Sequence, residues 1–259
     1  MERYKTICLD LDGTVYKGNQ AIRESVDFIR TLQQSGIEPY FITNNSSRTV
    51  LEQQQKLKRL GVETSEHQIM TSAIASAKYC SQNYSGKTVQ MIGESGLREA
   101  LLNEGIPLVE SDGDIVIMGI DHEITYEKLA SACLAIRKGA RFLATNGDLA
   151  LPNEIGLVPG NGAFIELVKA STGVAPTILG KPQSYMLEFV QQQTGANKEE
   201  MLMVGDNYDT DILSGIRYGI DTVHLQGGVT SLEEVLGKME APTYMFKTLS
   251  EWNHKKGLV

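Results

Sequence analysis

The chain of 259 residues alternates short apolar runs with amphipathic helical patterns along most of its length. The first run, residues 6–12 (TICLDLD), precedes residues 21–36, where apolar residues recur at helical spacing and a glycine ends the pattern. A second helical pattern covers residues 50–61, and further strand-like runs are 38–44, 88–93, 114–121, 141–146, 176–180, 201–205 and 221–226. Strands that alternate with helices predict parallel sheets covered by helices, so we expect an α/β fold.

The composition and charge are those of an ordinary soluble protein, with 41% hydrophobic residues and a formal net charge of −8. This balance argues against general binding to nucleic acid or to anionic membranes. The three cysteines lie far apart, the N-terminus lacks the apolar region of a signal peptide, and no apolar run reaches membrane-spanning length. We therefore expect a soluble cytoplasmic protein without nucleic-acid or membrane partners. A monomer or a homodimer is expected, although composition does not distinguish the two.

Polar side chains with catalytic potential follow four of the strand-like runs. They are Asp10 and Asp12 after the first run, Thr43, Asn44 and Asn45 after the second, Lys181 after 176–180, and Asp206 after 201–205, with Asn207 and Asp211 close behind. In an open parallel sheet, ligands bind beyond the carboxyl ends of the strands. The sequence therefore predicts that these side chains gather at one site.

A long middle section separates the second of these groups from the third. Residues 79–177 have their own strand–helix alternation and their own glycine-rich stretch. This organisation predicts a second α/β unit inserted into the first. We expect a doubly wound core built from residues 1–78 and 178–259, with residues 79–177 as the insertion.

Each group also has an ordinary structural explanation when it is taken alone. The two N-terminal aspartates can be turn acids, residues 43–47 a polar loop with a helix cap, and Lys181 a solvated lysine. In residues 205–211, Asp209 can cap a helix while Asp211 favours its dipole. These explanations remain open for any single motif.

Their joint placement favours a functional interpretation. Four carboxylates, Asp10, Asp12, Asp206 and Asp211, would repel one another unless a cation such as Mg²⁺ balanced them. Lys181, with the side chains that follow the second run, suits an anionic group beside that metal. Phosphate is the obvious candidate, because a metal, a lysine and polar donors are the usual parts for phosphoryl transfer.

The motifs resemble those of the haloacid dehalogenase (HAD) superfamily of phosphohydrolases, and specifically its NagD-like or p-nitrophenylphosphatase branch. Residues 10–15 (DLDGTV) resemble the first motif, 43–45 (TNN) the second, Lys181 the third and 205–211 the fourth, in the order of the family. This branch also carries a large α/β cap between the second and third motifs. The resemblance implies a Rossmann-like HAD core with an inserted cap that selects the substrate.

The resemblance assigns a role to each motif residue. Asp10 would be the nucleophile that forms a phosphoaspartyl intermediate, and Asp12 the general acid and base. Thr43, Asn44, Asn45, Lys181 and Asn207 would bind the phosphoryl group of the substrate. Mg²⁺ would be held by Asp10, Asp206 and the main-chain oxygen of Asp12, with Asp211 fixing waters or Lys181. The implied enzyme is a phosphatase of small phosphomonoesters, of the sugar phosphate, nucleotide, phosphoglycolate or pyridoxal phosphate type.

Residues 145–164 are interpreted as a long loop that faces the active site, with a plain glycine-rich connector as the alternative. Asn146, Asp148 and Glu154 offer directional polar contacts there, so Asp148 is expected to help select the leaving group. The C-terminal Trp252 is assigned to packing together with nearby aromatic residues. The four histidines are scattered and receive no role.

Two other functions are considered. The first is a phosphate-responsive regulatory module in which Asp10 is phosphorylated and turnover is slow. Asp12, which could activate water, and the inserted unit favour a hydrolase instead. The second is a phosphomutase or phosphotransferase of the same superfamily, which the cap type disfavours.

Overall fold

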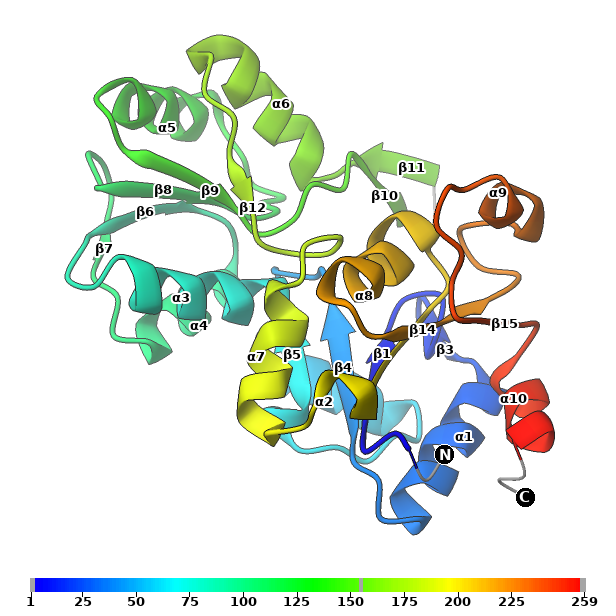
Figure 1. Cartoon of the computed structure of the whole chain (residues 1–259). Helices are drawn as coiled ribbons and strands as arrows, with labels where there is room; N and C mark the ends of the chain where they lie inside the picture. The colour runs from blue at the N-terminus through cyan, green and yellow to red at the C-terminus, as the bar shows by residue number, and fades with distance from the viewer. Residues whose placement is uncertain (1–2, 154–155, 257–259) are drawn as a thin grey trace. The chain divides into compact units, whose positions relative to one another are not determined.

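The computed structural model describes residues 3–153 and 156–256 (Figure 1). The chain forms two compact units. Unit 1 comprises Met1–Thr43, Leu51–Met70 and Lys181–Val259, and unit 2 comprises Asn44–Val50 and Thr71–Gly180. The crossing expected after residue 78 lies inside helix α3 (Ser72–Asn83), which packs against α4 (Ser95–Asn103) of unit 2. The division therefore falls before α3, because a continuous helix stays with its packing partner.

Unit 1 is built on a six-stranded sheet in the order β15-β14-β13-β1-β4-β5. The strands are β1 (Thr6–Asp10), β4 (Pro39–Thr43), β5 (Ile69–Thr71), β13 (Met201–Gly205), β14 (Asp221–Leu225) and β15 (Tyr244–Phe246). Strand β1 pairs in parallel with β4 and β13, β13 with β14, and β14 with β15. Numbered along the chain, the order is 3-2-1-4-5-6, that of a Rossmann-like doubly wound sheet, which confirms the expected fold class.

Helices cover this sheet, and its central strands are buried along their whole length. Every residue of β1, β4 and β13 is buried, as expected for parallel strands that are covered on both faces. The helices are α1 (Arg23–Gln34), α2 (Val50–Arg59), α7 (Tyr185–Thr194), α8 (Leu213–Tyr218), α9 (Leu232–Leu236) and α10 (Leu249–Lys256). Helix α1 packs against α10, and α7 packs against α8 (Figure 1).

Trp252 of α10 has the packing role that the sequence predicts. Its side chain is buried, with its ring centroid 5.0 Å from that of Phe28 and 6.2 Å from that of Phe246. Smaller elements of unit 1 are the hairpin β2 (Tyr16–Lys17) and β3 (Gln20–Ala21), and the short helical turns η1 (Glu66–Gln68), η2 (Lys198–Glu200) and η3 (Tyr208–Ile212). The hairpin follows the first motif directly, and η3 carries the end of the fourth.

Unit 2 is a second parallel sheet with helices on both faces. Its strands are β6 (Val89–Ile92), β7 (Leu108–Val109), β8 (Ile115–Met118), β9 (Arg141–Ala144) and β12 (Thr177–Ile178), in the order β12-β9-β8-β6-β7. Helices α5 (Tyr126–Arg137) and α6 (Asn161–Thr172) cover one face, and α3 and α4 the other (Figure 1). Numbered along the chain, the order is 2-1-3-4-5, which is the flavodoxin-like arrangement.

The interpretation of residues 145–164 as a loop is wrong. Ala150–Asn153 (β10) and Gly156–Pro159 (β11) pair as an antiparallel hairpin, and α6 begins at Asn161. The sequence signal is weak because each short strand contains a proline, which cannot donate a hydrogen bond to a strand ladder. Glu154 lies outside the described residues.

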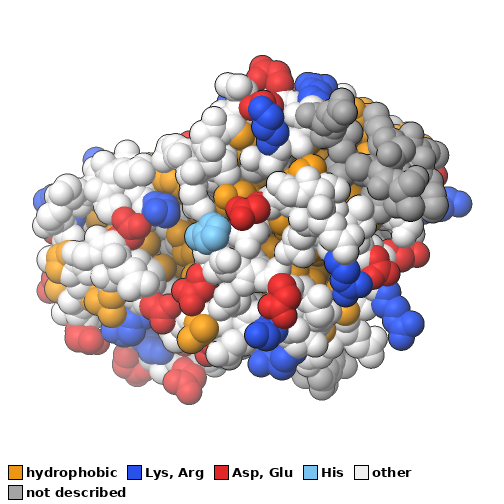
Figure 2. Space-filling model, turned by 90° about the horizontal axis from the view of Figure 1, so that it is seen from below, with side chains coloured by type: hydrophobic (Ala, Val, Ile, Leu, Met, Phe, Trp, Pro, Cys, Tyr) orange, Lys and Arg blue, Asp and Glu red, His pale blue; other side chains and the backbone are white. Residues whose placement is uncertain are grey.

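Surface charge, cysteines and helix hydrophobicity agree with the composition of the chain. On the face shown in Figure 2, acidic and basic side chains are interspersed rather than gathered into areas of one sign. Cys8, Cys80 and Cys133 are free thiols. Within the described ranges, no helix combines the length and apolar character needed to cross a membrane.

Candidate active site

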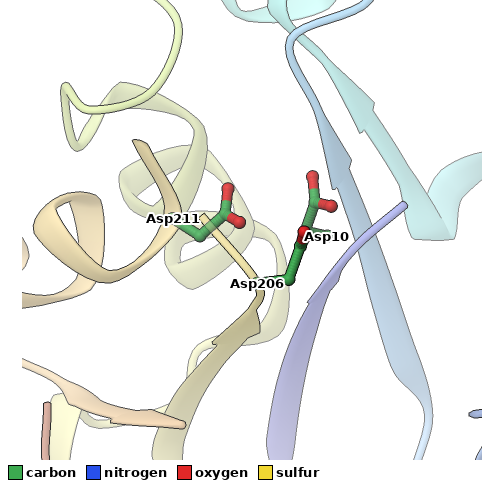
Figure 3. A group of neighbouring side chains, drawn as sticks. All are labelled: Asp10, Asp206 and Asp211. Atoms are coloured by element: carbon green, nitrogen blue, oxygen red, sulfur yellow. The ribbon is translucent and has the colours of Figure 1, made fainter. Parts of the chain in front are cut away.

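Three buried carboxylates meet where strands β1 and β13 of unit 1 end. Leu9 is in register with Val204, so Asp10 and Asp206 leave adjacent strands at the same edge of the sheet. This is the topological switch point of the sheet, where the strand order reverses. Asp211 returns from the turn η3, and ligand oxygens of the three carboxylates all lie within 4.8 Å of one another (Figure 3).

Glycines allow these carboxylates to pack directly against the main chain. A Cβ atom at Gly13 would lie 2.3 Å from Asp206 Oδ2, and one at Gly228 would lie 1.9 Å from the same oxygen. A Cβ atom at Gly205 would lie 2.3 Å from Asp211 Oδ2. Gly13 also has a φ of +100°, which strongly favours glycine. Any side chain at these positions would displace a carboxylate of the cluster.

Hydrogen bonds fix the Asp206 side chain in one orientation. Its Oδ1 accepts from Thr14 Oγ1 at 3.2 Å, and its Oδ2 accepts from the main-chain N–H of Val229 at 2.8 Å. The main-chain oxygen of Asp206 accepts from Thr230 N and from His224 Nε2, both at 3.2 Å. Loop 226–230 thus holds this aspartate in place from the side of β14.

Lys181 bridges two of the three carboxylates. Its Nζ lies 2.5 Å from Asp10 Oδ1, 2.7 Å from Asp211 Oδ1 and 3.2 Å from the main-chain oxygen of Ile42. The lysine is only 3% exposed, so these oxygens replace the water that its ammonium group would otherwise bind. Asp211 is fixed further by the main-chain N–H of Asn207, which donates to its Oδ2 at 3.1 Å.

The cluster carries more negative than positive charge. Burial raises the pKa of Asp10 well above its ordinary value, with a further rise from Asp211 and opposition from Lys181. Burial, followed by the charge of Asp211, raises the pKa of Asp206 from 3.8 to about 6. Burial alone would lower the pKa of Lys181, but its two aspartates raise it above the ordinary value. An all-oxygen set of this kind suits a hard divalent cation.

The other predicted residues of unit 1 lie around this cluster. Asp12 is exposed in the turn that follows β1, and Thr43 is the buried last residue of β4, the neighbouring strand. Asn207 caps η3, with its side-chain oxygen accepting from Asp209 N at 3.0 Å. The residue that caps this helical turn is therefore Asn207 rather than Asp209. The Oδ1 atom of Asp209 instead pairs with Lys238 Nζ at 2.7 Å. A phosphate-binding role for Asn207 stays a prediction.

Asn44, Asn45 and Asp148 belong to unit 2. Asp148 Oδ2 accepts from Asn44 Nδ2 at 3.1 Å and from Asn146 Nδ2 at 2.6 Å. Asn45 Oδ1 accepts from Arg48 N at 3.1 Å, as in a local turn. The carboxylate predicted to select the leaving group is thus hydrogen-bonded to a residue of the second motif.

The segment after the second motif fills the switch point of the unit 2 sheet. This point lies between the ends of β6 and β8, where a doubly wound sheet would bind a ligand. Gly96 N donates to Ser47 O at 2.9 Å, and a Cβ atom at Gly96 would lie 2.2 Å from Arg48 O. A Cβ atom at Gly119 would lie 2.8 Å from Ser46 Oγ. Glycines admit the chain itself into this crevice.

Sequence reasoning missed the supports of Asp206. Gly228, Val229 and Thr230 directly follow the β14 region, and the glycine pair there could have indicated a close approach of the main chain. His224 received no role, yet it is buried behind Asp206, and burial lowers its pKa. Neither contact has a local sequence spacing, because each joins Asp206, which follows β13, to a residue of β14 or of the loop after β14.

Comparisons with known proteins match this arrangement. The family model described as haloacid dehalogenase-like hydrolase matches residues 7–107, and the HAD-hydrolase-like model matches residues 178–252. The 5′-nucleotidase YutF of Bacillus subtilis (strain 168) is 44% identical over 252 residues, covering 97% of this chain and 98% of that protein. An acid sugar phosphatase of Staphylococcus haemolyticus is 45% identical over 251 residues, covering 96% of this chain and 95% of that protein. The crystal structure of a double mutant thermostable NPPase from Geobacillus stearothermophilus matches with a TM-score of 0.92 at 45% identity. The match covers 97% of this chain and 99% of that one.

A doubly wound sheet with a carboxylate cluster at its switch point is the framework of a hydrolase of this class. The chain belongs to the haloacid dehalogenase-like hydrolase family. The resemblance to its NagD-like phosphatase branch is confirmed, and the enzyme class is phosphoric monoester hydrolase. Membership in a family of enzymes favours a phosphatase with multiple turnover. It disfavours the alternative of a phosphate-responsive regulatory module with slow turnover.

The glycine contacts of Asp206 generate the first prediction. If Asp206 holds a divalent cation, Gly228→Ala should weaken activation by that cation roughly 10–100-fold, the usual cost of disturbing a support of a metal ligand. The measurement is a titration of phosphatase activity with metal. Gly237→Ala is the matched control, because its Cβ would lie 3.5 Å from its nearest neighbour, an ordinary contact. Equal metal affinity in the two variants would contradict the packing argument.

Proposed function

We propose that this phosphatase hydrolyses small phosphomonoesters with Mg²⁺, through a phosphoaspartyl intermediate on Asp10. The observation that carries the proposal is the buried cluster of Asp10, Asp206 and Asp211, bridged by Lys181. The cluster pairs a nucleophile with a lysine that can also balance the charge of a bound phosphoryl group. Asp12, exposed in the next turn, is the proposed general acid and base.

The proposed reaction has two displacements at phosphorus. In the first, a carboxylate oxygen of Asp10 bonds to phosphorus while the ester P–O bond breaks and Asp12 gives its proton to the leaving oxygen. In the second, water attacks phosphorus and gives a proton to Asp12, and the bond between Asp10 and phosphorus breaks. Inorganic phosphate leaves, and both aspartates return to their starting states.

The residues at the cluster fit Mg²⁺. Buried carboxylates whose pKa values are raised by burial and by one another are the setting in which a cation restores charge balance. Asp10, Asp206 and the main-chain oxygen of Asp12 would hold the ion, with Asp211 as a support or further ligand. When bound, Mg²⁺ would neutralise charge on the phosphoryl oxygens. Thr43, Asn44, Asn45, Lys181 and Asn207 are the proposed phosphoryl-binding residues.

The substrate class is proposed from the relatives and from the inserted unit. Relatives named 5′-nucleotidase and acid sugar phosphatase support a small phosphorylated metabolite. Unit 2, which contains the expected insertion 79–177, is proposed to be the cap that selects the substrate, and its separate sheet supports this role. The cytoplasmic location and the monomeric or homodimeric state stay predictions.

The nucleophile and the general acid can be separated by two amide variants. Asp12→Asn should lower kcat roughly 10²–10⁴-fold, the usual contribution of general acid–base catalysis, while keeping its main-chain metal ligand. Asp10→Asn should lower kcat further, because an amide neither attacks phosphorus nor balances the metal charge. Phosphate release from an alkyl phosphate, whose leaving oxygen needs a proton, measures both. Near-wild-type turnover in Asp10→Asn would show that the nucleophile is wrongly assigned.

The raised pKa of Asp206 predicts a pH-dependent destabilisation of the metal-free protein. A carboxyl group with a raised pKa in the folded state stabilises the fold below its unfolded value of 3.8, and this contribution is lost as pH rises through about 6. Metal-free Asp206→Asn should therefore be more stable than the wild type above this window, with the difference shrinking below it. Thermal unfolding after chelation, from pH 4 to pH 7, measures the difference.

Mg²⁺ should reverse this effect in the wild type. At 100 times its Kd, a bound ion adds about 2.7 kcal/mol of stability, and Asp206→Asn should lose most of that gain. The rise in Tm with MgCl2 should be larger at pH 7 than at pH 5, because the metal competes with protons for Asp206. An equal rise at both pH values would contradict the assignment of Asp206 as a metal ligand.

The hydrogen bonds of Asp148 yield the substrate-selection prediction. If Asp148 contacts the leaving group, Asp148→Ala should change relative kcat/KM among substrates by roughly ten- to a hundredfold, the value of one positioned hydrogen bond. The activation by Mg²⁺ should change much less. A panel of sugar phosphates, nucleotides and p-nitrophenyl phosphate measures the change. Equal losses on every substrate would show that Asp148 acts only by holding Asn44.

A further inference from the structure

Tyr16 closes the turn that carries Asp12 and Gly13. Its main-chain oxygen accepts from Gly13 N at 2.7 Å, and its own N–H donates to Leu11 O at 3.1 Å. Asp12 and Tyr16 also form a β-bridge, and Tyr16 begins the short hairpin β2–β3. The position of the Asp12–Gly13 turn is therefore tied to the position of Tyr16.

The side chain of Tyr16 is held in turn by helix α2. Gln53 Nε2 donates to the Tyr16 hydroxyl at 3.1 Å, and Lys56 Nζ lies 3.6 Å from the centroid of the Tyr16 ring. Tyr16 is 3% exposed, so its ring lies inside the protein. An ammonium group over a tyrosine face is attracted by the ring quadrupole, and the attraction is strongest when water is excluded.

The buried face of α2 is unusual for a helix in a protein core. Its buried residues are Gln53, Lys56 and Leu57, which follow one another at helical spacing. Gln53 is 1% exposed and Lys56 is 7% exposed, although lysine is seldom buried unless it is paired. Apolar side chains of similar length would satisfy the packing alone. The polar pair therefore calls for an explanation other than core formation.

We propose that Lys56 and Gln53 are positioning residues that fix Tyr16 and, through its main chain, the Asp12–Gly13 turn. This inference rests on the proposed role of Asp12 as the general acid. The held turn keeps the Asp12 carboxyl group within reach of the leaving oxygen when the P–O bond breaks.

The leaving group distinguishes positioning of an acid from general damage to the enzyme. An alkoxide needs its proton as it departs, whereas p-nitrophenolate is stable without one. A displaced general acid therefore slows the hydrolysis of an alkyl phosphate much more than that of p-nitrophenyl phosphate. A loss of folded protein, of metal or of phosphate binding lowers kcat/KM for both substrates equally.

The experiment compares Lys56→Met with Lys56→Arg and with the matched control Lys58→Met, which changes an exposed lysine of the same helix. We expect Lys56→Met to lower kcat/KM roughly tenfold to a hundredfold for an alkyl phosphate, as for a catalytic group moved by about 1 Å. The loss for p-nitrophenyl phosphate should be much smaller. Lys56→Arg, which keeps the positive charge, should retain most of the wild-type activity, and Lys58→Met should match the wild type. Thermal unfolding should show that Lys56→Met stays folded, because methionine is apolar and of similar length and fills the same buried space.

Two further variants keep the test decisive if Lys56→Met does not fold. Tyr16→Phe and Gln53→Leu each remove the same hydrogen bond, so both should show the leaving-group dependence and their effects should not add. Equal losses on both substrates in the folded variants would overturn the inference. Asp12→Asn, measured alongside, tests the proposed general acid separately from the positioning role of Lys56. If Asp12→Asn lacks the leaving-group dependence, the proposed general acid is wrong. If only Asp12→Asn shows this dependence and the Lys56 variant does not, the positioning role of Lys56 is rejected.

Discussion

Repulsion among three buried carboxylates is the constraint on which the active site of this protein depends. Lys181 offsets part of it by bridging Asp10 and Asp211, and it comes from a position 171 residues beyond Asp10 in the sequence. The unit 1 sheet brings these positions together because β13 enters beside β1 at the switch point. The charge that remains uncompensated is the basis of the proposed cation binding. On that proposal, the destabilisation of the metal-free site and the function of the metal-bound site have the same origin.

Much of this arrangement could be predicted from the sequence, because it depends on local patterns. Apolar runs that end in aspartate or lysine identify both the strands and the edge at which their ends meet. Asp10, Asp206, Asp211 and Lys181 are expected together on that ground. In the structure Lys181 bonds Asp10 and Asp211, and ligand oxygens of the three aspartates lie within 4.8 Å of one another. The order of the motifs along the chain indicates the haloacid dehalogenase family, and the comparisons confirm it.

The contacts that could not be predicted join residues with no fixed spacing. Gly228 admits the Asp206 carboxylate, and His224 binds its main-chain oxygen, but neither position is unusual within its own segment. The hairpin β10–β11 was missed because proline weakens the strand signal. Lys56 is a similar case. A lysine in a polar helix predicts exposure, and its buried position over the Tyr16 ring depends on the fold.

The two units show why a doubly wound sheet does not by itself specify a function. Both have a switch point where a ligand could bind beyond the strand ends. In unit 1 that position carries carboxylates and a lysine, whereas in unit 2 Ser46, Ser47 and Arg48 fill it through close contacts with Gly96 and Gly119. The segment that occupies unit 2 directly follows the second motif, so the fold uses one crevice for chemistry and the other to anchor the chain that leaves Thr43. Function therefore depends on which side chains the loops deliver to each edge.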